Sequence, residues 1–190
     1  MAQKHLIAAL GDSLTAGHVG SMMGPTYSPY TDELQKRLGE DFSISNHGLD
    51  GDLTSGMVRR FRQHVLPKQP DTLLLMGGAN DLGWGLDFSE ILENLTTIID
   101  ESLAAGIQVF VAAITPIARI PSATQKRLSI NPSIEDICKQ KDITFVDVFY
   151  PLADQKQDLL EQYSSDGLHL NPAGYTRIGQ LFHEALSTKS

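Results

Sequence analysis

A serine, a histidine and an aspartate stand where each can take part in nucleophilic catalysis. Ser13 lies in the stretch Gly11-Asp12-Ser13-Leu14, directly after a short apolar run, whereas Asp166 and His169 stand three residues apart near the other end of the chain. A serine hydroxyl is a weak nucleophile until a base takes its proton. A histidine base works best when a carboxylate holds its second ring nitrogen. The three residue types are therefore those that acyl transfer requires.

Two further stretches can supply hydrogen-bond donors to such a reaction. Acyl transfer places negative charge on the former carbonyl oxygen in the transition state, and N–H groups aimed at this oxygen stabilise it. Asn80, in Gly78-Ala79-Asn80-Asp81, follows the most apolar run of the chain and carries a side-chain amide. Gly51 has no side chain to shield its backbone N–H from a substrate oxygen. These two residues are candidates for an oxyanion hole.

Each stretch taken by itself also has a structural explanation. Ser13 suits a turn or a helix N-cap, Asp166 is typical of a turn, and His169 can be a surface or core histidine. A glycine turn with a polar cap explains Asn80 equally well. The catalytic interpretation is favoured over the structural one because all four stretches follow apolar runs or precede a helix. They can therefore converge on one edge of one sheet.

The elements that must position these residues are predicted by apolar periodicity. Five short runs rich in Leu, Ile, Val and Phe are typical of buried strands in a parallel sheet. They are His5–Leu10, Phe42–Ser45, Thr72–Met76, Gln108–Ile114 and Thr144–Val148. Helical patterns separate the runs, and this alternation predicts right-handed βαβ units with helices on both faces. We expect a three-layer α/β/α sandwich that forms one domain over residues 1–190.

Local signals predict where helices begin and where loops lie. Asn171-Pro172 is typical of an N-cap followed by proline, and Asn131-Pro132 predicts the start of the helix before the fifth strand in the same way. The stretches Thr15–Tyr27 and Pro116–Ser129 have no regular pattern. We expect them to be loops at the carboxyl edge of the sheet, where ligands of such folds bind.

Composition excludes several classes of partner. The net charge is −8, with 23 acidic and 15 basic residues, and a field of this sign disfavours binding to nucleic acid. No apolar run approaches the roughly 20 residues of a membrane helix, and the first one ends at Gly11, short of a signal peptide. We expect a cytoplasmic protein.

The cysteine and the histidines do not predict a metal site. Cys138 has no cysteine partner, and neither it nor the histidines have a metal-ligand spacing, so no metal is expected. The oligomeric state is not readable from the sequence.

The stretches around Ser13, Gly51, Asn80 and His169 resemble, in order, the four blocks of the SGNH hydrolases, also called GDSL lipases and esterases. The resemblance spans nearly the whole chain. It implies a flavodoxin-like fold with a five-stranded parallel sheet, and a triad of Ser13 as nucleophile, His169 as base and Asp166 as its orienting partner. It also implies an oxyanion hole from the backbone N–H groups of Ser13 and Gly51 and the Asn80 amide. The reaction of this family requires no cofactor.

Apolar residues beside these blocks are expected to line the substrate site. They are Leu14, Leu82, Trp84, Ile117 and Leu168. Such a lining favours a small-molecule substrate, a short- to medium-chain acyl or aryl ester, with lysophospholipase-like or thioesterase-like specificity also compatible. A carbohydrate deacetylase or an acyltransferase with the same catalytic residues is one alternative. Another is a catalytically silent flavodoxin-like binding module with a phosphate on Gly11–Gly17, which leaves Asn80, Asp166 and His169 unexplained.

Overall fold

The computed structural model describes residues 4–20, 24 and 26–188. Within these residues, five parallel strands form the main sheet in the spatial order β4-β1-β5-β6-β7. The strands are β1 (His5–Gly11), β4 (Phe42–Gly48), β5 (Thr72–Met76), β6 (Gln108–Ala112) and β7 (Thr144–Val146). All five predicted strands are confirmed, with small differences at their ends.

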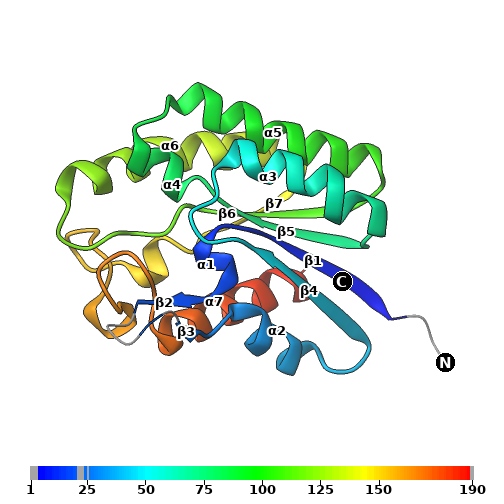
Figure 1. Cartoon of the computed structure of the whole chain (residues 1–190), viewed down its shortest axis with the longest axis horizontal. Coiled ribbons are helices and arrows are strands. Elements are labelled where there is room, and N and C mark those ends of the chain that lie inside the picture. The colour runs from blue at the N-terminus through cyan, green and yellow to red at the C-terminus, as the bar shows by residue number, and fades with distance from the viewer. Residues whose placement is uncertain (1–3, 21–23, 25, 189–190) are drawn as a thin grey trace.

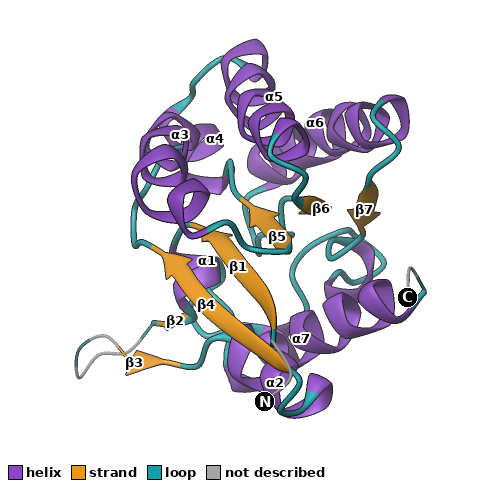
Figure 2. Cartoon of the chain, turned by 90° about the vertical axis from the view of Figure 1, so that its right-hand side faces the viewer, coloured by secondary structure: helices purple, strands orange, loops and turns teal. Residues whose placement is uncertain are grey.

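Helices cover both faces of the sheet. In Figures 1 and 2, α3 (Thr54–Arg60), α5 (Phe88–Ala104) and α6 (Pro121–Gln140) lie on one face. On the other face lie α2 (Tyr30–Leu38) and α7 (Pro172–Ser187). The predicted three-layer α/β/α architecture is confirmed.

The strand order is that of flavodoxin-like sheets, in which the chain reverses direction once. From β1 it moves to one side, to β4, and then crosses to the other side, to β5. Because both crossovers must be right-handed, the reversal places α2 and α3 on opposite faces and leaves a crevice where the chain leaves β1 and β5. The register sets Gly11 at the end of β1 beside Met76 of β5 and Gly48 of β4.

The core lies between the central strands and the apolar faces of the helices. Every residue of β5 is buried. Ile91, Leu95, Ile98 and Ile99 of α5 follow the three- and four-residue spacing of one helix face, and all are buried. The edge strand β4 is only partly buried, which explains why its sequence is more polar than that of β5.

The last helix begins as predicted, with the Asn171 side chain accepting a hydrogen bond of 3.1 Å from the backbone N–H of Gly174. The start predicted at Asn131-Pro132 is wrong, because Pro132 lies inside α6. The prediction of a loop over Pro116–Ser129 is wrong from Pro121 onward, because α6 begins there.

The Asn131 side chain is used for a tertiary contact instead of a cap. Its amide donates to the carbonyl of Ile114 at 3.0 Å and accepts from the N–H of the same residue at 2.8 Å. Arg127, Ile130 and Ile134 are buried at helical spacing on both sides of Pro132. Packing of this face outweighs the loss of one helical hydrogen bond at the proline.

The stretch Thr15–Tyr27 contains three short elements. Helix α1 (Ser13–Ala16) is followed by β2 (His18–Val19), which pairs with β3 (Thr26–Tyr27) in an antiparallel hairpin. Residues 21–23 and 25 lie outside the described part of the chain. Helix α4 (Ala79–Trp84) occupies the equivalent place after β5.

We predict that Gly11→Ala destabilises the protein by roughly 2 kcal/mol, because small-to-large changes in packed regions cost about 1–3 kcal/mol. A Cβ at this position would lie 2.1 Å from Thr15 Oγ1 and 2.3 Å from the backbone oxygen of Met76. Urea unfolding measures the effect. Gly83→Ala is the control, because a Cβ there has no heavy atom within 4 Å. Equal loss of stability in both variants would contradict this account of the β1–β5 contact.

Candidate active site

The structure brings together the three side chains that the sequence analysis selected for nucleophilic catalysis. Ser13 begins α1 directly after β1, and its Oγ lies 3.2 Å from Nε2 of His169. The other ring nitrogen, Nδ1, lies 2.8 Å from Oδ2 of Asp166. The three groups form a continuous chain of contacts from carboxylate to imidazole to hydroxyl. Ser13 and His169 are 156 residues apart in the sequence.

The loop before α7 holds Asp166 and His169 in a fixed relation. Oδ1 of Asp166 accepts hydrogen bonds from the backbone N–H of Leu168 at 2.9 Å and of His169 at 2.7 Å. Gly167 makes the turn with a φ of +97°, which glycine adopts without strain. The carboxylate thus bonds the backbone with one oxygen and the imidazole with the other.

These hydrogen bonds also set the charge of Asp166. Partial burial raises its pKa, but bonds from the His169 ring and from the N–H groups of His169 and Leu168 outweigh burial and hold the pKa below its ordinary value. A charged carboxylate beside Nδ1 favours the tautomer protonated there. Nε2 then faces Ser13 as a proton acceptor, the arrangement that a general base requires.

A hydrogen bond joins Asn80 to the loop that carries Gly51, the other candidate oxyanion donor outside α1. Nδ2 of Asn80, in the first turn of α4, donates to the backbone oxygen of Asp52 at 2.9 Å. The preceding residue, Gly51, has a φ of +74°, and no heavy atom lies within 4 Å of where its Cβ would be. Among the described hydrogen bonds, none uses the N–H of Gly51 or of Ser13, so both are free to meet a substrate. The second N–H of the Asn80 amide also has no partner among the described hydrogen bonds.

A cavity adjoins these residues. It has a volume of about 540 Å³, and its lining includes Asn80 and four of the five predicted apolar residues, namely Leu82, Trp84, Ile117 and Leu168. The structure does not bring Leu14 to this cavity, because the Leu14 side chain is buried in the hydrophobic core. Its position after Ser13 in a short helix turns it toward the protein interior.

Comparison with known proteins shows the family of this chain. A model of the GDSL-like lipase/acylhydrolase family matches residues 9–177. The chain belongs to this family. An arylesterase of Vibrio mimicus is 28% identical to this GDSL-family chain over 192 residues, covering 95% of this chain and 87% of the relative.

Solved structures share the fold of the GDSL-family chain. A GDSL-like lipase from Bacteroides thetaiotaomicron gives a TM-score of 0.83 at 22% identity, covering 100% of this chain and 93% of that one. An aryl esterase of M. smegmatis gives 0.78 at 19% identity, covering 98% and 99%. At such identities the likeness concerns the fold.

Buried carboxyl groups shape the turns of the GDSL-family site. Oδ1 of Asp12 accepts from the N–H of Leu14 at 2.9 Å, which fixes the first turn of α1 and hence the place of Ser13. Asp81 accepts from the N–H of Thr54 at 3.1 Å and from its hydroxyl at 2.6 Å. This bond ties α4 to the beginning of α3, and so ties Asn80 to the Gly51 loop.

Sequence reasoning missed the role of Arg60. Its guanidinium donates to the backbone oxygens of Gly11 at 2.8 Å and His47 at 2.6 Å, and it forms an ion pair of 2.6 Å with Asp52. One side chain therefore joins the ends of β1 and β4 to the loop that carries Gly51. Nothing in the local pattern around Arg60 distinguishes it from an ordinary helix-surface arginine.

His18, which the sequence gives no reason to place in the site, lies against His169. The ring centroids of His18 and His169 are 4.5 Å apart. Nδ1 of His18 lies 2.8 Å from Oδ2 of Asp50, which also accepts from the Tyr27 hydroxyl at 2.9 Å. No spacing in the sequence relates His18, Asp50 and Tyr27.

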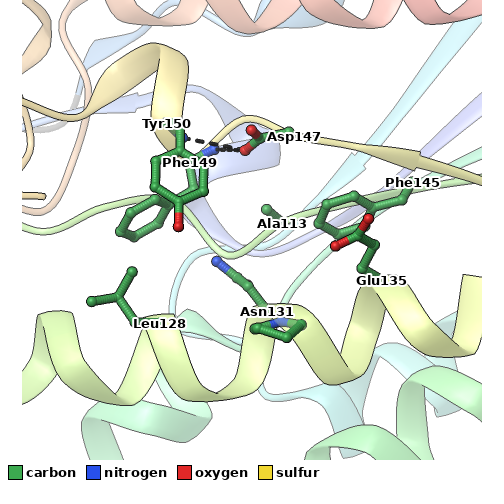
Figure 3. A pocket seen from close by; sticks show the side chains of 9 residues that line it. Ala113, Leu128, Asn131, Glu135, Phe145, Asp147, Phe149 and Tyr150 are labelled. Carbon is green, nitrogen blue, oxygen red and sulfur yellow. Dashed lines mark hydrogen bonds between the residues drawn. The ribbon is translucent and has the colours of Figure 1, made fainter.

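A second cavity lies across α6, at the β7 edge of the sheet (Figure 3). Its volume is about 210 Å³, and Phe145, Phe149 and Tyr150 supply its aromatic lining. Its lining contains no candidate oxyanion donor and no sequence neighbour of the triad, whereas Asn80 and Leu168, the residue before His169, line the first cavity. Asp147 in the second cavity accepts from the backbone N–H groups of Phe149 and Tyr150. The candidate active site is therefore the first cavity and the triad beside it.

The described residues form neither a metal cluster nor a membrane-spanning helix. In that part of the chain, no cluster of three or more His, Cys, Asp or Glu side chains is arranged to hold a metal ion. No helix there has the length and apolar character to cross a membrane.

We predict a pH-dependent stability difference between the wild type and Asp12→Asn. Burial, with smaller contributions from the charges of Asp81 and Asp52, raises the pKa of Asp12 from 3.8 to about 7 in the folded protein. The folded state therefore binds this proton more tightly than the unfolded state. The stability that the protonated group contributes is present below about pH 4 and is lost as the pH rises to about 7.

The free energy of unfolding of Asp12→Asn, relative to the wild type, should therefore rise between about pH 4 and 7 by on the order of 1 kcal/mol per pH unit, and stay constant above. Urea unfolding at a series of pH values measures it. Asp87→Asn, at an exposed position, is the control and should follow the wild type. Parallel curves for Asp12→Asn and the wild type would refute the burial argument.

Proposed function

We propose that this chain is a serine ester hydrolase that forms an acyl-enzyme on Ser13. The observation that carries the proposal is the line of contacts from Asp166 through His169 to Ser13 Oγ, at 2.8 and 3.2 Å. Membership of the GDSL-like lipase/acylhydrolase family supports the same reaction class.

The reaction proceeds in two halves. Nε2 of His169 takes the proton of Ser13 Oγ as this oxygen attacks the ester carbonyl, and the positive imidazole is stabilised by Asp166. The N–H groups of Ser13, Gly51 and the Asn80 amide meet the charge on the carbonyl oxygen. His169 returns the proton to the leaving alcohol, and water then releases the acyl group by the same steps.

The proposed substrates are short- to medium-chain acyl or aryl esters. Three apolar side chains beside Asn80, those of Leu82, Ile117 and Leu168, suit an acyl chain or a ring. Trp84 is 78% exposed at the rim and offers an aromatic surface. The name of the Vibrio mimicus relative, an arylesterase, supports the aryl part of this proposal.

We predict that Ser13→Ala abolishes turnover of p-nitrophenyl esters without loss of fold, because the variant lacks the attacking oxygen. Initial rates on a series from acetate to longer acyl chains measure turnover, and circular dichroism checks the fold. Ser129→Ala, which removes an exposed hydroxyl from α6, is the matched control and should keep wild-type activity. Retained turnover in Ser13→Ala would refute the nucleophile.

We predict that Asn80→Ala lowers kcat by about a hundredfold, the effect of removing one oxyanion donor, with a smaller change in KM. Asn94→Ala is the control because it removes an amide that bonds Thr54 instead of facing the substrate site. It should lose far less activity. A kcat for Asn80→Ala equal to that of Asn94→Ala would remove Asn80 from the mechanism.

A further inference from the structure

Arg127 lies buried beside the proposed active site. The residue is only 2% exposed, and it lines the cavity that Asn80 and Leu168 also line. Arg127 comes from α6, whereas Ser13 lies in α1. The proposed mechanism assigns it no role.

The guanidinium group is only partly satisfied by the protein. Nε donates to the backbone oxygen of Thr115 at 2.9 Å, and Nη1 donates to that of Ala123 at 3.1 Å. A guanidinium has five N–H donors. Among the described residues, none accepts a hydrogen bond from Nη2, and no carboxylate forms an ion pair with Arg127. Donors on Nη1 and Nη2 therefore remain for a ligand.

A buried cation without a counter-charge is costly. Burial lowers the pKa of Arg127 to about 10, so the group remains charged at neutral pH. The negative charge of Asp12 opposes this lowering, but the raised pKa of Asp12, about 7, leaves that carboxyl group only partly charged at neutral pH. Arg127 therefore keeps a positive charge beside the proposed active site, and no described carboxylate forms an ion pair with it.

The surroundings of Arg127 are positive, although the chain as a whole carries a net charge of −8. Lys126 lines the same cavity, and its Nζ lies 3.3 Å from the backbone oxygen of Leu82. The described lining contains no Asp or Glu. Positive groups in a cleft with apolar walls focus the field and attract an anion.

We propose that the cavity binds the carboxylate of an ester substrate and that Arg127 receives it. The inference rests on the proposed function and names its substrate class: esters that carry a carboxylate on the acyl or the alcohol part. A guanidinium pairs with a carboxylate through two parallel hydrogen bonds. Leu82, Ile117 and Leu168 provide the apolar wall for the carbon atoms between the ester and the carboxylate.

Matched esters test the proposal. For the acyl part, p-nitrophenyl hemisuccinate is compared with p-nitrophenyl butyrate. For the alcohol part, 4-acetoxybenzoate is compared with its methyl ester. In the wild type, one carboxylate ester should exceed its neutral partner in kcat/KM by about tenfold or more, through a lower KM. The reason is that hydrogen bonds between charged groups are stronger than those between neutral groups. Which pair shows the effect identifies the part that carries the anion.

Arg127→Met should abolish this preference and change the kcat/KM of the neutral ester much less. Arg59→Met removes the same charge from an exposed position on α3 and should keep the preference. Arg127→Lys, which keeps the charge but loses the planar fork, should keep part of it. Competitive inhibition of the wild type by succinate or benzoate, measured with a neutral ester, tests the site even where Arg127→Met fails to fold.

The outcomes separate this inference from the function on which it rests. Hydrolysis of neutral esters, with no carboxylate preference and no inhibition by either carboxylate, overturns the role of Arg127 and leaves the serine hydrolase in place. A preference that Arg127→Met retains also overturns it. Absence of hydrolysis for all four esters overturns the proposed function, and the assignment of Arg127 with it.

Discussion

The reversal of chain direction around β1 is the constraint on which the rest of the structure depends. Parallel strands with right-handed crossovers must place α2 and α3 on opposite faces when the chain moves first to β4 and then to β5. The loops after β1 and β5 therefore separate, and the crevice between them receives Ser13 and Asn80. The long return of the chain to α7 then brings His169 over the same crevice.

Buried polar groups hold this crevice in shape at a cost to stability. Asp12 sets the turn at Ser13, Asp81 joins α4 to α3, and Arg60 ties the ends of β1 and β4 to the Gly51 loop. Each of these charges is wholly or largely removed from water, and such burial is unfavourable unless hydrogen bonds offset it. Oδ2 of Asp12 has no described partner. Incomplete satisfaction of this kind is common where a site is organised for function instead of stability.

The sequence predicts the fold well because its main signals are local and strong. The run Thr72–Met76 is recognisable as a buried strand, and Asn171-Pro172 as a helix start. Prediction failed at Asn131-Pro132, where packing of a distant strand end decided the structure instead of the local cap signal. Short motifs are enough to select the proposed triad, Ser13, Asp166 and His169. His18 and Arg127 reach their places through tertiary contacts that leave no pattern in the sequence.

The proposed function requires a covalent intermediate at Ser13. The most direct test is mass spectrometry of the protein quenched with acid during turnover of a p-nitrophenyl ester, followed by peptide mapping. The account predicts a mass increase equal to the acyl group, located on the peptide that contains Ser13 and lost as turnover ends. An acyl group located on another residue would contradict it, and so would turnover without any acylated protein when the release of p-nitrophenol shows a burst.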